Sequence, residues 1–129
     1  MIVVDASVIT EAITVEQPGG PLRARLAAQP FLYAPHLLDA EFVQSLRGLV
    51  ARGVLTVRTA ELALGDFASM LIDRQSTEPL ILRMWRLRQN LSAYDAAYVA
   101  LAEALGVPLL TRDRRIATAP GLRCEVEVG

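Results

Sequence analysis

Apolar residues follow two alternating patterns along the chain: short unbroken runs, and longer stretches in which they recur every three or four positions. The short runs cover residues 2–4, 31–34 and 107–110, and each is bounded by proline, glycine or polar residues, which is typical of buried parallel strands. Helical spacing fills the segments between them, at about residues 8–16, 22–29, 37–51, 59–72, 79–88, 93–105 and 114–119. This alternation predicts an α/β fold, with a mostly parallel central sheet covered by helices on both faces in an α/β/α arrangement.

The stretch from Ser92 to Gly106 carries the clearest end signals. Ser92 precedes an alanine-rich run and Asp95 follows three residues later, a spacing typical of a helix N-terminus. Gly106 is a residue type that adopts the left-handed conformation at a helix end. We therefore expect a helix over about 93–105, and by the same reasoning we expect Ser7 to cap the first helix.

Two further segments give weaker strand patterns. Residues 73–77 fit a turn or the end of a short third strand, whereas residues 124–128 alternate between apolar and polar as a half-buried edge strand does. The single cysteine, Cys124, can form no internal disulfide and is expected to be a small buried residue of that strand.

The length of 129 residues fits one domain spanning residues 1–129. No apolar run approaches the roughly 20 residues of a membrane span, so no membrane association is expected. Residues 1–5 fit a strand and lack the features of an export signal, which favours the cytoplasm. Because the apolar content of 53% is high for a domain of this size, we expect an exposed apolar patch.

The charges are nearly balanced at −1, so any nucleic-acid binding must rest on local basic patches. All 13 basic residues are arginine. A Walker phosphate loop, a Schiff-base enzyme and a phospho-receiver domain each depend on a lysine, so these classes are disfavoured. A genome rich in G and C would also favour arginine codons, and both explanations stay open.

Four acids stand out by their positions. Asp5 ends the first strand, Asp113 follows the last apolar run, Asp95 opens a helix and Glu41 lies on the apolar stripe of its helix. Taken singly, each aspartate also fits a helix cap, and Glu41 also fits an ion pair at the edge of the core.

Taken together, the four acids predict a metal site. If the first and fourth strands are neighbours, Asp5 and Asp113 face one crevice at the carboxyl edge of the sheet. Clustered carboxylates repel one another unless a cation joins them, and oxygen ligands suit Mg²⁺ or Mn²⁺. Such an ion on carboxylates chiefly serves phosphate chemistry.

A familiar pattern lies in four segments: Ile2-Val-Val-Asp-Ala-Ser7, Glu41 within its helix, Leu91-Ser-Ala-Tyr-Asp-Ala-Ala-Tyr-Val-Ala-Leu-Ala-Glu103, and Pro108-Leu-Leu-Thr-Arg-Asp113. Together they resemble the PIN-domain ribonucleases, specifically the VapC-type toxins of bacterial toxin–antitoxin pairs. The resemblance covers essentially the whole chain, and the Tyr-Asp-Ala-Ala-Tyr and Thr-Arg-Asp segments are its most specific parts.

The resemblance implies a Mg²⁺- or Mn²⁺-dependent endoribonuclease that hydrolyses RNA through a metal-activated water. If the acidic site of the family is transferred to the matching positions of this sequence, the catalytic acids would be Asp5, Glu41, Asp95 and Asp113. The three aspartates would hold the metal, while Glu41 would be a ligand or would orient the attacking water.

The resemblance also implies supporting residues and partners. Ser7 and Thr111 would add hydroxyl hydrogen bonds around the ligands. The protein would form a homodimer and would be held inactive by a cognate VapB-type antitoxin. A groove for that partner would draw on these residues, most of which also fit the core: Val8, Ile9, Ile13, Val15, Leu46, Leu49 and Val50.

Arginine is the residue type expected to grip RNA phosphates, because its planar fork matches their geometry. The candidates are Arg112, Arg114, Arg115 and Arg86, whereas Arg83 better fits a helix face with intramolecular partners. Asp39, Asp73 and His36 are left out of the site.

Two other functions stay open: a non-catalytic PIN-fold module that binds RNA or protein, and a nuclease that acts on DNA or in RNA maturation.

Overall fold

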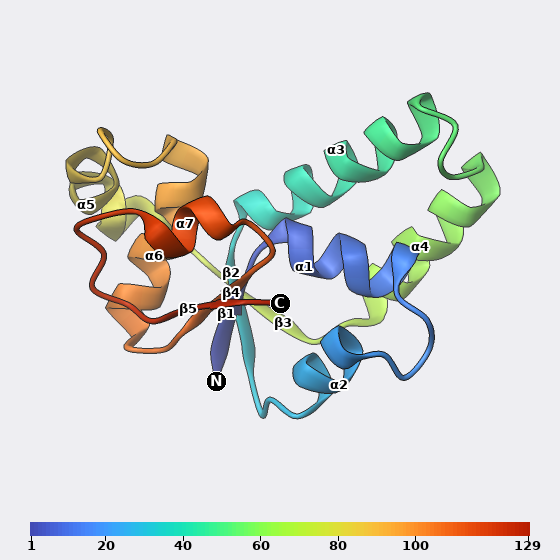
Figure 1. The fold of residues 1–129 in the computed structure, drawn as a ribbon, viewed down its shortest axis with the longest axis horizontal. Coiled ribbons are helices and arrows are strands. Elements are labelled where there is room, and N and C mark those ends of the chain that lie inside the picture. The colour runs from blue at the N-terminus through green and yellow to red at the C-terminus, as the bar shows by residue number, and fades with distance from the viewer.

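Five parallel strands form the central sheet of the computed structural model, which describes residues 1–129 (Figure 1). The strands are β1 (Ile2–Val4), β2 (Leu32–Pro35), β3 (Ile72–Gln75), β4 (Leu109–Thr111) and β5 (Val126–Val128). Their order across the sheet is β3-β2-β1-β4-β5, and every pairing is parallel. The first and fourth strands are therefore neighbours, with Val3 opposite Leu109. This arrangement confirms the predicted mostly parallel sheet.

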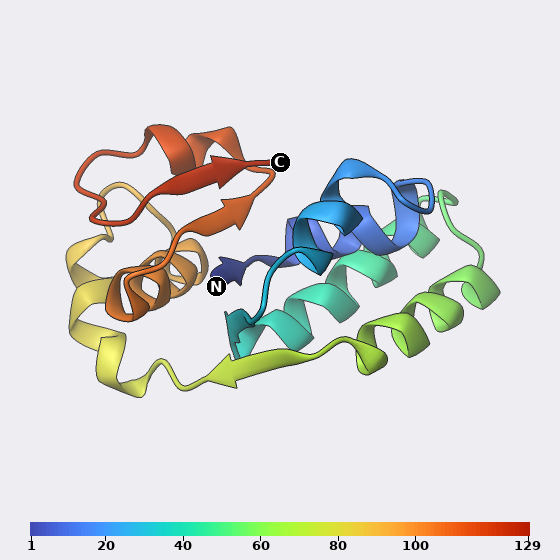
Figure 2. The same ribbon diagram turned by 90° about the horizontal axis from the view of Figure 1, so that it is seen from below.

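Helices connect the strands and lie on both sides of the sheet (Figure 2). They are α1 (Ala6–Thr10), the π-helix η1 (Glu11–Val15), α2 (Pro21–Ala27), α3 (Leu37–Ala51), α4 (Val57–Ser69), the short 3-10 helix η2 (Glu78–Leu80), α5 (Ile81–Arg86), α6 (Ala93–Leu105) and α7 (Arg114–Thr118). The predicted bounds of α3 and α6 are confirmed.

The pleat of β1 divides the core in two. Side chains alternate along a strand, so Ile2 and Val4 pack toward α1 to α4, while Val3 packs toward α6 and α7. All three are fully buried. Each face of the sheet thus has its own hydrophobic core, as the α/β/α prediction requires.

The first helix starts earlier than predicted. It begins at Ala6 because Asp5, and not Ser7, caps it: the Asp5 Oδ1 atom accepts a hydrogen bond from the Val8 N–H at 3.2 Å. Ser7 instead lies in the first turn, and its hydroxyl donates to Asp5. The prediction that Ser7 is the cap was wrong, although Ser7 still contacts the acid beside it.

The fourth helix ends earlier than predicted. Thr56 caps α4 by accepting from the Thr59 N–H, and the backbone is extended at Met70. Ile72 therefore belongs to β3 rather than to the helix. Cys124 is half-buried and precedes β5, so its prediction as a buried strand residue was wrong.

The surface carries many large apolar side chains, in keeping with the high apolar content of the sequence. Leu71 is 93% exposed, and Ile81, Leu82 and Trp85 on α5 are each about 60% exposed. None of the helices has both the length and the apolar character needed to cross a bilayer.

Candidate active site

The carboxyl edge of the sheet brings the four selected acids together. Asp5 directly follows β1, Asp113 follows β4, Glu41 comes from α3, and Asp95 lies in the first turn of α6. All four line one hollow of about 300 Å³, with Ala6, Ser7, Gln44, Ser45 and Tyr98 completing its wall. Residues from both ends of the chain thus meet at the crevice that parallel sheets form outside their carboxyl ends.

Asp5 is the most enclosed of the four acids, at 7% exposure. The Ser7 hydroxyl donates to its Oδ1 atom at 2.5 Å, and the Thr111 hydroxyl donates to its Oδ2 atom. Thr111 in turn accepts from the Asp113 N–H at 3.0 Å, which ties the end of β4 to the end of β1. The expected hydroxyl contacts of Ser7 and Thr111 are therefore present in the structure.

Glu41 has a partner that the sequence did not reveal. The Tyr98 hydroxyl donates to Glu41 Oε1 at 2.5 Å, although the two residues are 57 positions apart. Tyr98 is only 2% exposed, so its ring is fixed by the core on which α6 packs. The sole sequence clue was its place on α6, three residues after Asp95, on the same helix face.

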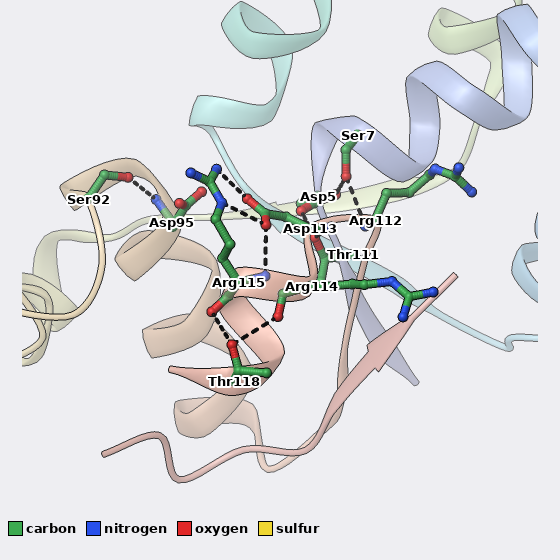
Figure 3. Close-up of polar contacts among 10 residues, drawn as sticks. All are labelled: Asp5, Ser7, Ser92, Asp95, Thr111, Arg112, Asp113, Arg114, Arg115 and Thr118. Atoms are coloured by element: carbon green, nitrogen blue, oxygen red, sulfur yellow. Dashed lines mark hydrogen bonds and ion pairs between the residues drawn. The ribbon is translucent and has the colours of Figure 1, made fainter. Parts of the chain in front are cut away.

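Arg115 is bound to Asp113 beside Asp95 (Figure 3). The Arg115 guanidinium donates to both Asp113 carboxylate oxygens, at 3.1 and 2.8 Å, and its backbone N–H also donates to Oδ1. In Figure 3 the Arg115 side chain lies between the Asp95 and Asp113 carboxylates. Asp113 is thus both the cap of α7 and a member of the acidic hollow.

Burial and like charge oppose ionisation at three of the four acids. Burial raises the pKa of Asp5, Glu41 and Asp95, and a neighbouring carboxylate raises each of them further. The hydrogen bonds from Arg115 instead lower the pKa of Asp113. A site that holds several carboxylates in this way favours a bound cation.

The donor set consists of carboxylate and hydroxyl oxygens, which are the ligands of hard divalent ions such as Mg²⁺ and Mn²⁺. In the present arrangement no three acidic, histidine or cysteine side chains lie close enough to share one ion. The Asp113 carboxylate is engaged by Arg115 instead. The oxygen ligands therefore suit such an ion chemically, but in this arrangement the acidic side chains are too far from one another to bind it together.

The candidate RNA-binding arginines occupy different places. Arg112 and Arg114 extend away from the acids in Figure 3, whereas Arg115 is turned toward Asp113. Arg86 is exposed on α5 and does not line the hollow. Arg83 pairs with Glu103 at 2.7 Å, which agrees with the intramolecular role predicted for it.

The three polar residues left out of the site lie outside the hollow. Asp39 pairs with Arg74 at 2.8 Å, and Asp73 accepts a hydrogen bond from Gln75. His36 is exposed before α3 and makes no side-chain capping bond. Of the residues considered for a partner groove, Val8, Ile9 and Leu46 are buried in the core, which was the alternative interpretation of them.

A larger, apolar hollow of about 490 Å³ lies elsewhere, against α2. Its ionisable residues are Arg23 and Asp66, and the Arg23 guanidinium donates to the backbone carbonyls of Ala12 and Ile13. A single acid, together with an arginine whose guanidinium is already hydrogen-bonded to the backbone, suggests no catalytic reaction. The acidic hollow is therefore the better candidate for an active site.

Known proteins resemble this chain in sequence and in fold. Residues 2–122 match the family described as the PIN domain. Ribonuclease VapC1 of Mycobacterium tuberculosis is 41% identical over 127 residues, which cover 98% of this chain and 96% of that protein.

Two solved structures share the fold at lower identity. PAE2754 from Pyrobaculum aerophilum aligns with a TM-score of 0.68 and 22% identity, over 98% of this chain and 83% of its own. Mycobacterium tuberculosis VapC20, described as a sarcin-ricin loop cleaving toxin, aligns with a TM-score of 0.60 and 19% identity, over 84% and 87% of the two chains.

Proposed function

Because the chain belongs to the PIN-domain family, and within it to the VapC ribonucleases, we propose that it is a metal-dependent endoribonuclease toxin formed by one domain over residues 1–129. The observation that carries the proposal is the acidic hollow. Four carboxylates from four separate elements line it, and burial raises the pKa of three of them. That arrangement costs stability and has a clear use only if a cation and a phosphodiester occupy the hollow.

We assign Asp5, Asp95 and Asp113 as the residues that would hold Mg²⁺ or Mn²⁺. When bound, such an ion would supply a water of lowered pKa and neutralise the charge that builds on the phosphate. Ser7 and Thr111 would keep both oxygens of Asp5 in fixed directions, as hydrogen-bonded supports of metal ligands do. Arg115 would hold Asp113 until the ligands assemble.

Glu41 is assigned to the attacking water. Its pKa is raised chiefly by burial, which makes the carboxylate a better proton acceptor than an exposed glutamate. Tyr98 donates to Oε1 and thereby fixes the direction of the carboxylate, leaving Oε2 without a protein partner. Glu41 would use that oxygen to orient the water toward the phosphorus.

The proposed partners follow from the family. We expect a VapB-type antitoxin to hold the enzyme inactive and the chain to form a homodimer in the cytoplasm. The exposed apolar side chains of α5, namely Ile81, Leu82 and Trp85, are available for such contacts.

The test is cleavage of a panel of structured RNAs, which includes the sarcin-ricin loop because VapC20 is described as cutting it. The purified protein is incubated with Mg²⁺, with Mn²⁺ or with EDTA, and Asp95→Asn and Asp73→Asn are run alongside. Asp73 is an exposed acid outside the hollow, so its variant is the matched control. We expect discrete fragments that require the metal, persist in Asp73→Asn and disappear in Asp95→Asn. RNA that is bound but never cut would favour a non-catalytic module.

A further inference from the structure

A polar groove leads away from the acidic hollow between α1 and α3. It encloses about 450 Å³, and its wall is formed by Ser7, Thr10, Glu11, Val15, Gln44, Ser45, Gly48, Leu49, Arg52 and Arg112. Ser7, Gln44 and Ser45 also line the acidic hollow, so the two spaces adjoin. An extended ligand, such as a nucleic-acid strand, that is held at the acids therefore has a path that continues along α3.

Two guanidinium groups face this groove. Arg52 is exposed at the end of α3 and has no acidic partner within ion-pair distance. Gly48 leaves room for it, because a Cβ atom there would lie only 3.3 Å from Arg52 Nη1. The Arg52 side chain thus lies back over the helix and beside the groove, with its charge uncompensated.

Arg112 is more constrained than Arg52. Its Nη1 atom donates to the Gly129 carbonyl at 3.1 Å, and its Nη2 atom is 3.8 Å from Glu11, a long ion pair. Glu11 is the only acid in the wall of the groove, against two arginines. The groove is therefore cationic beside a strongly anionic hollow.

We propose that this groove binds the phosphate backbone of the single-stranded RNA that flanks the cleavage site, with Arg52 as its main phosphate contact. The inference rests on the proposed function and adds a binding site to it. Guanidinium, hydroxyl and amide groups line the groove, and these are the groups that contact nucleic-acid phosphates and sugars. No aromatic ring lines it, so stacking on bases plays no part. The groove accordingly contributes affinity rather than sequence preference.

The test measures RNA binding in the Asp95→Asn background, where the probe is not cut. The probe is a fluorescein-labelled, single-stranded RNA of mixed sequence about 12 nucleotides long, and its anisotropy is followed at several salt concentrations. Arg52→Gln is compared with Arg47→Gln, which removes the same charge from the same helix but from a residue that lines a different, mostly apolar hollow.

We expect Arg52→Gln to weaken binding about five- to tenfold for every sequence tried, and Arg47→Gln to leave it nearly unchanged. The slope of log affinity against log salt should fall by about 0.7 for the one lost contact. Equal binding by the two variants would overturn the inference while leaving the nuclease intact. A loss of antitoxin binding with RNA binding preserved would also overturn it, in favour of a protein occupant. If the Asp95→Asn protein binds no RNA at all, the groove assignment fails, whereas the proposed function is decided separately by cleavage of the RNA panel with the unmodified protein.

Discussion

Asp95 lies where folding stability and the proposed metal binding make opposite demands. Burial, and then the charge of Asp113, raise its pKa, so the folded protein holds a proton there more tightly than the unfolded chain does. The stability that this proton contributes is present at low pH and is lost as pH rises through the raised pKa. At neutral pH the ionised Asp95 is therefore a cost to the fold.

We predict that Asp95→Asn melts at or above the wild-type temperature at pH 7 while RNA cleavage falls by about 10²-fold or more. The amide keeps the shape and removes the repelling charge, and the Ser92 cap is untouched because it accepts from the backbone N–H. Thermal melts by circular dichroism and single-turnover cleavage measure the two effects. A clear drop in melting temperature would contradict the argument from pKa.

At Tyr98, the contribution of the buried ring to packing can be separated from the hydrogen bond that its hydroxyl donates to Glu41. Tyr98→Phe keeps the buried ring and removes only the hydroxyl that donates to Glu41. Loss of a hydrogen bond to a charged group should lower kcat about tenfold with little change in KM. Because that hydrogen bond lowers the pKa of Glu41, its removal lets the pKa rise, and the acid limb of the rate profile should move to higher pH.

The matched control is Tyr94→Phe on the same helix, since Tyr94 is 62% exposed. It should leave the pH profile unchanged. If Tyr98→Phe lowered the rate at all pH values without moving the acid limb, Tyr98 would support the fold alone.

Sequence reasoning found the four acids because each marks itself locally. Asp5 and Asp113 follow apolar runs, Asp95 opens a helix, and Glu41 interrupts an apolar stripe. Tyr98 was missed because its contact joins α3 to α6, and such pairing depends on how the two helices meet beside the sheet. Arg115 was predicted to bind RNA, yet its guanidinium forms an ion pair with Asp113, two residues away.

At the scale of elements, one partly buried ion pair joins α5, α6 and the loop before β5. Arg83 donates to both Glu103 oxygens at 2.7 and 3.0 Å and to the Gly121 carbonyl, while Glu103 also accepts from the Arg123 N–H. Burial disfavours the ionised glutamate, but these hydrogen bonds outweigh it and lower its pKa. The resulting stability is present above the ordinary glutamate pKa of 4.5 and is lost as pH falls through the lowered value.

We predict that Arg83→Gln costs about 1–3 kcal/mol of unfolding free energy at pH 7, because a partly buried carboxylate loses its charged partner. The difference from wild type should shrink below pH 4.5 as Glu103 takes up a proton. Urea denaturation at several pH values measures it. Arg86→Gln, an exposed neighbour on α5, should stay within about 0.5 kcal/mol of wild type. A difference that is constant with pH would remove Glu103 from the explanation.

The elements that the sequence predicted best are those with strong signals at both ends. Helix α6 has Ser92 at its start and Gly106 at φ 67° at its end. Helix α1 was misplaced because Asp5 and Ser7 are both good caps, two residues apart, and only the fold decides which one faces the free Val8 N–H. The π-helix η1 continues α1 without a break in pattern, so nothing in the sequence marked it.

At the scale of the whole molecule, stability is divided between the cores on the two faces of the sheet. Phe42 is fully buried on α3 and stacks on Phe67 of α4, with ring centroids 4.1 Å apart. Phe42→Ala should cost about 3–5 kcal/mol, a large part of the 5–15 kcal/mol typical of a domain, and Phe42→Leu about 1 kcal/mol. Chemical denaturation measures both. A loss below 1 kcal/mol for the alanine variant would show that the aromatic pair is not central to this core.

The position of β1 between β2 and β4 has a consequence for the living cell. Asp5 is made among the first residues, but it gains its Thr111 partner and its neighbour Asp113 only after nearly the whole chain has left the ribosome. A nascent or truncated chain that lacks β4 has the early acids without the strand that aligns them. The acidic hollow is therefore completed only late in synthesis, and a chain that ends before β4 has no assembled site.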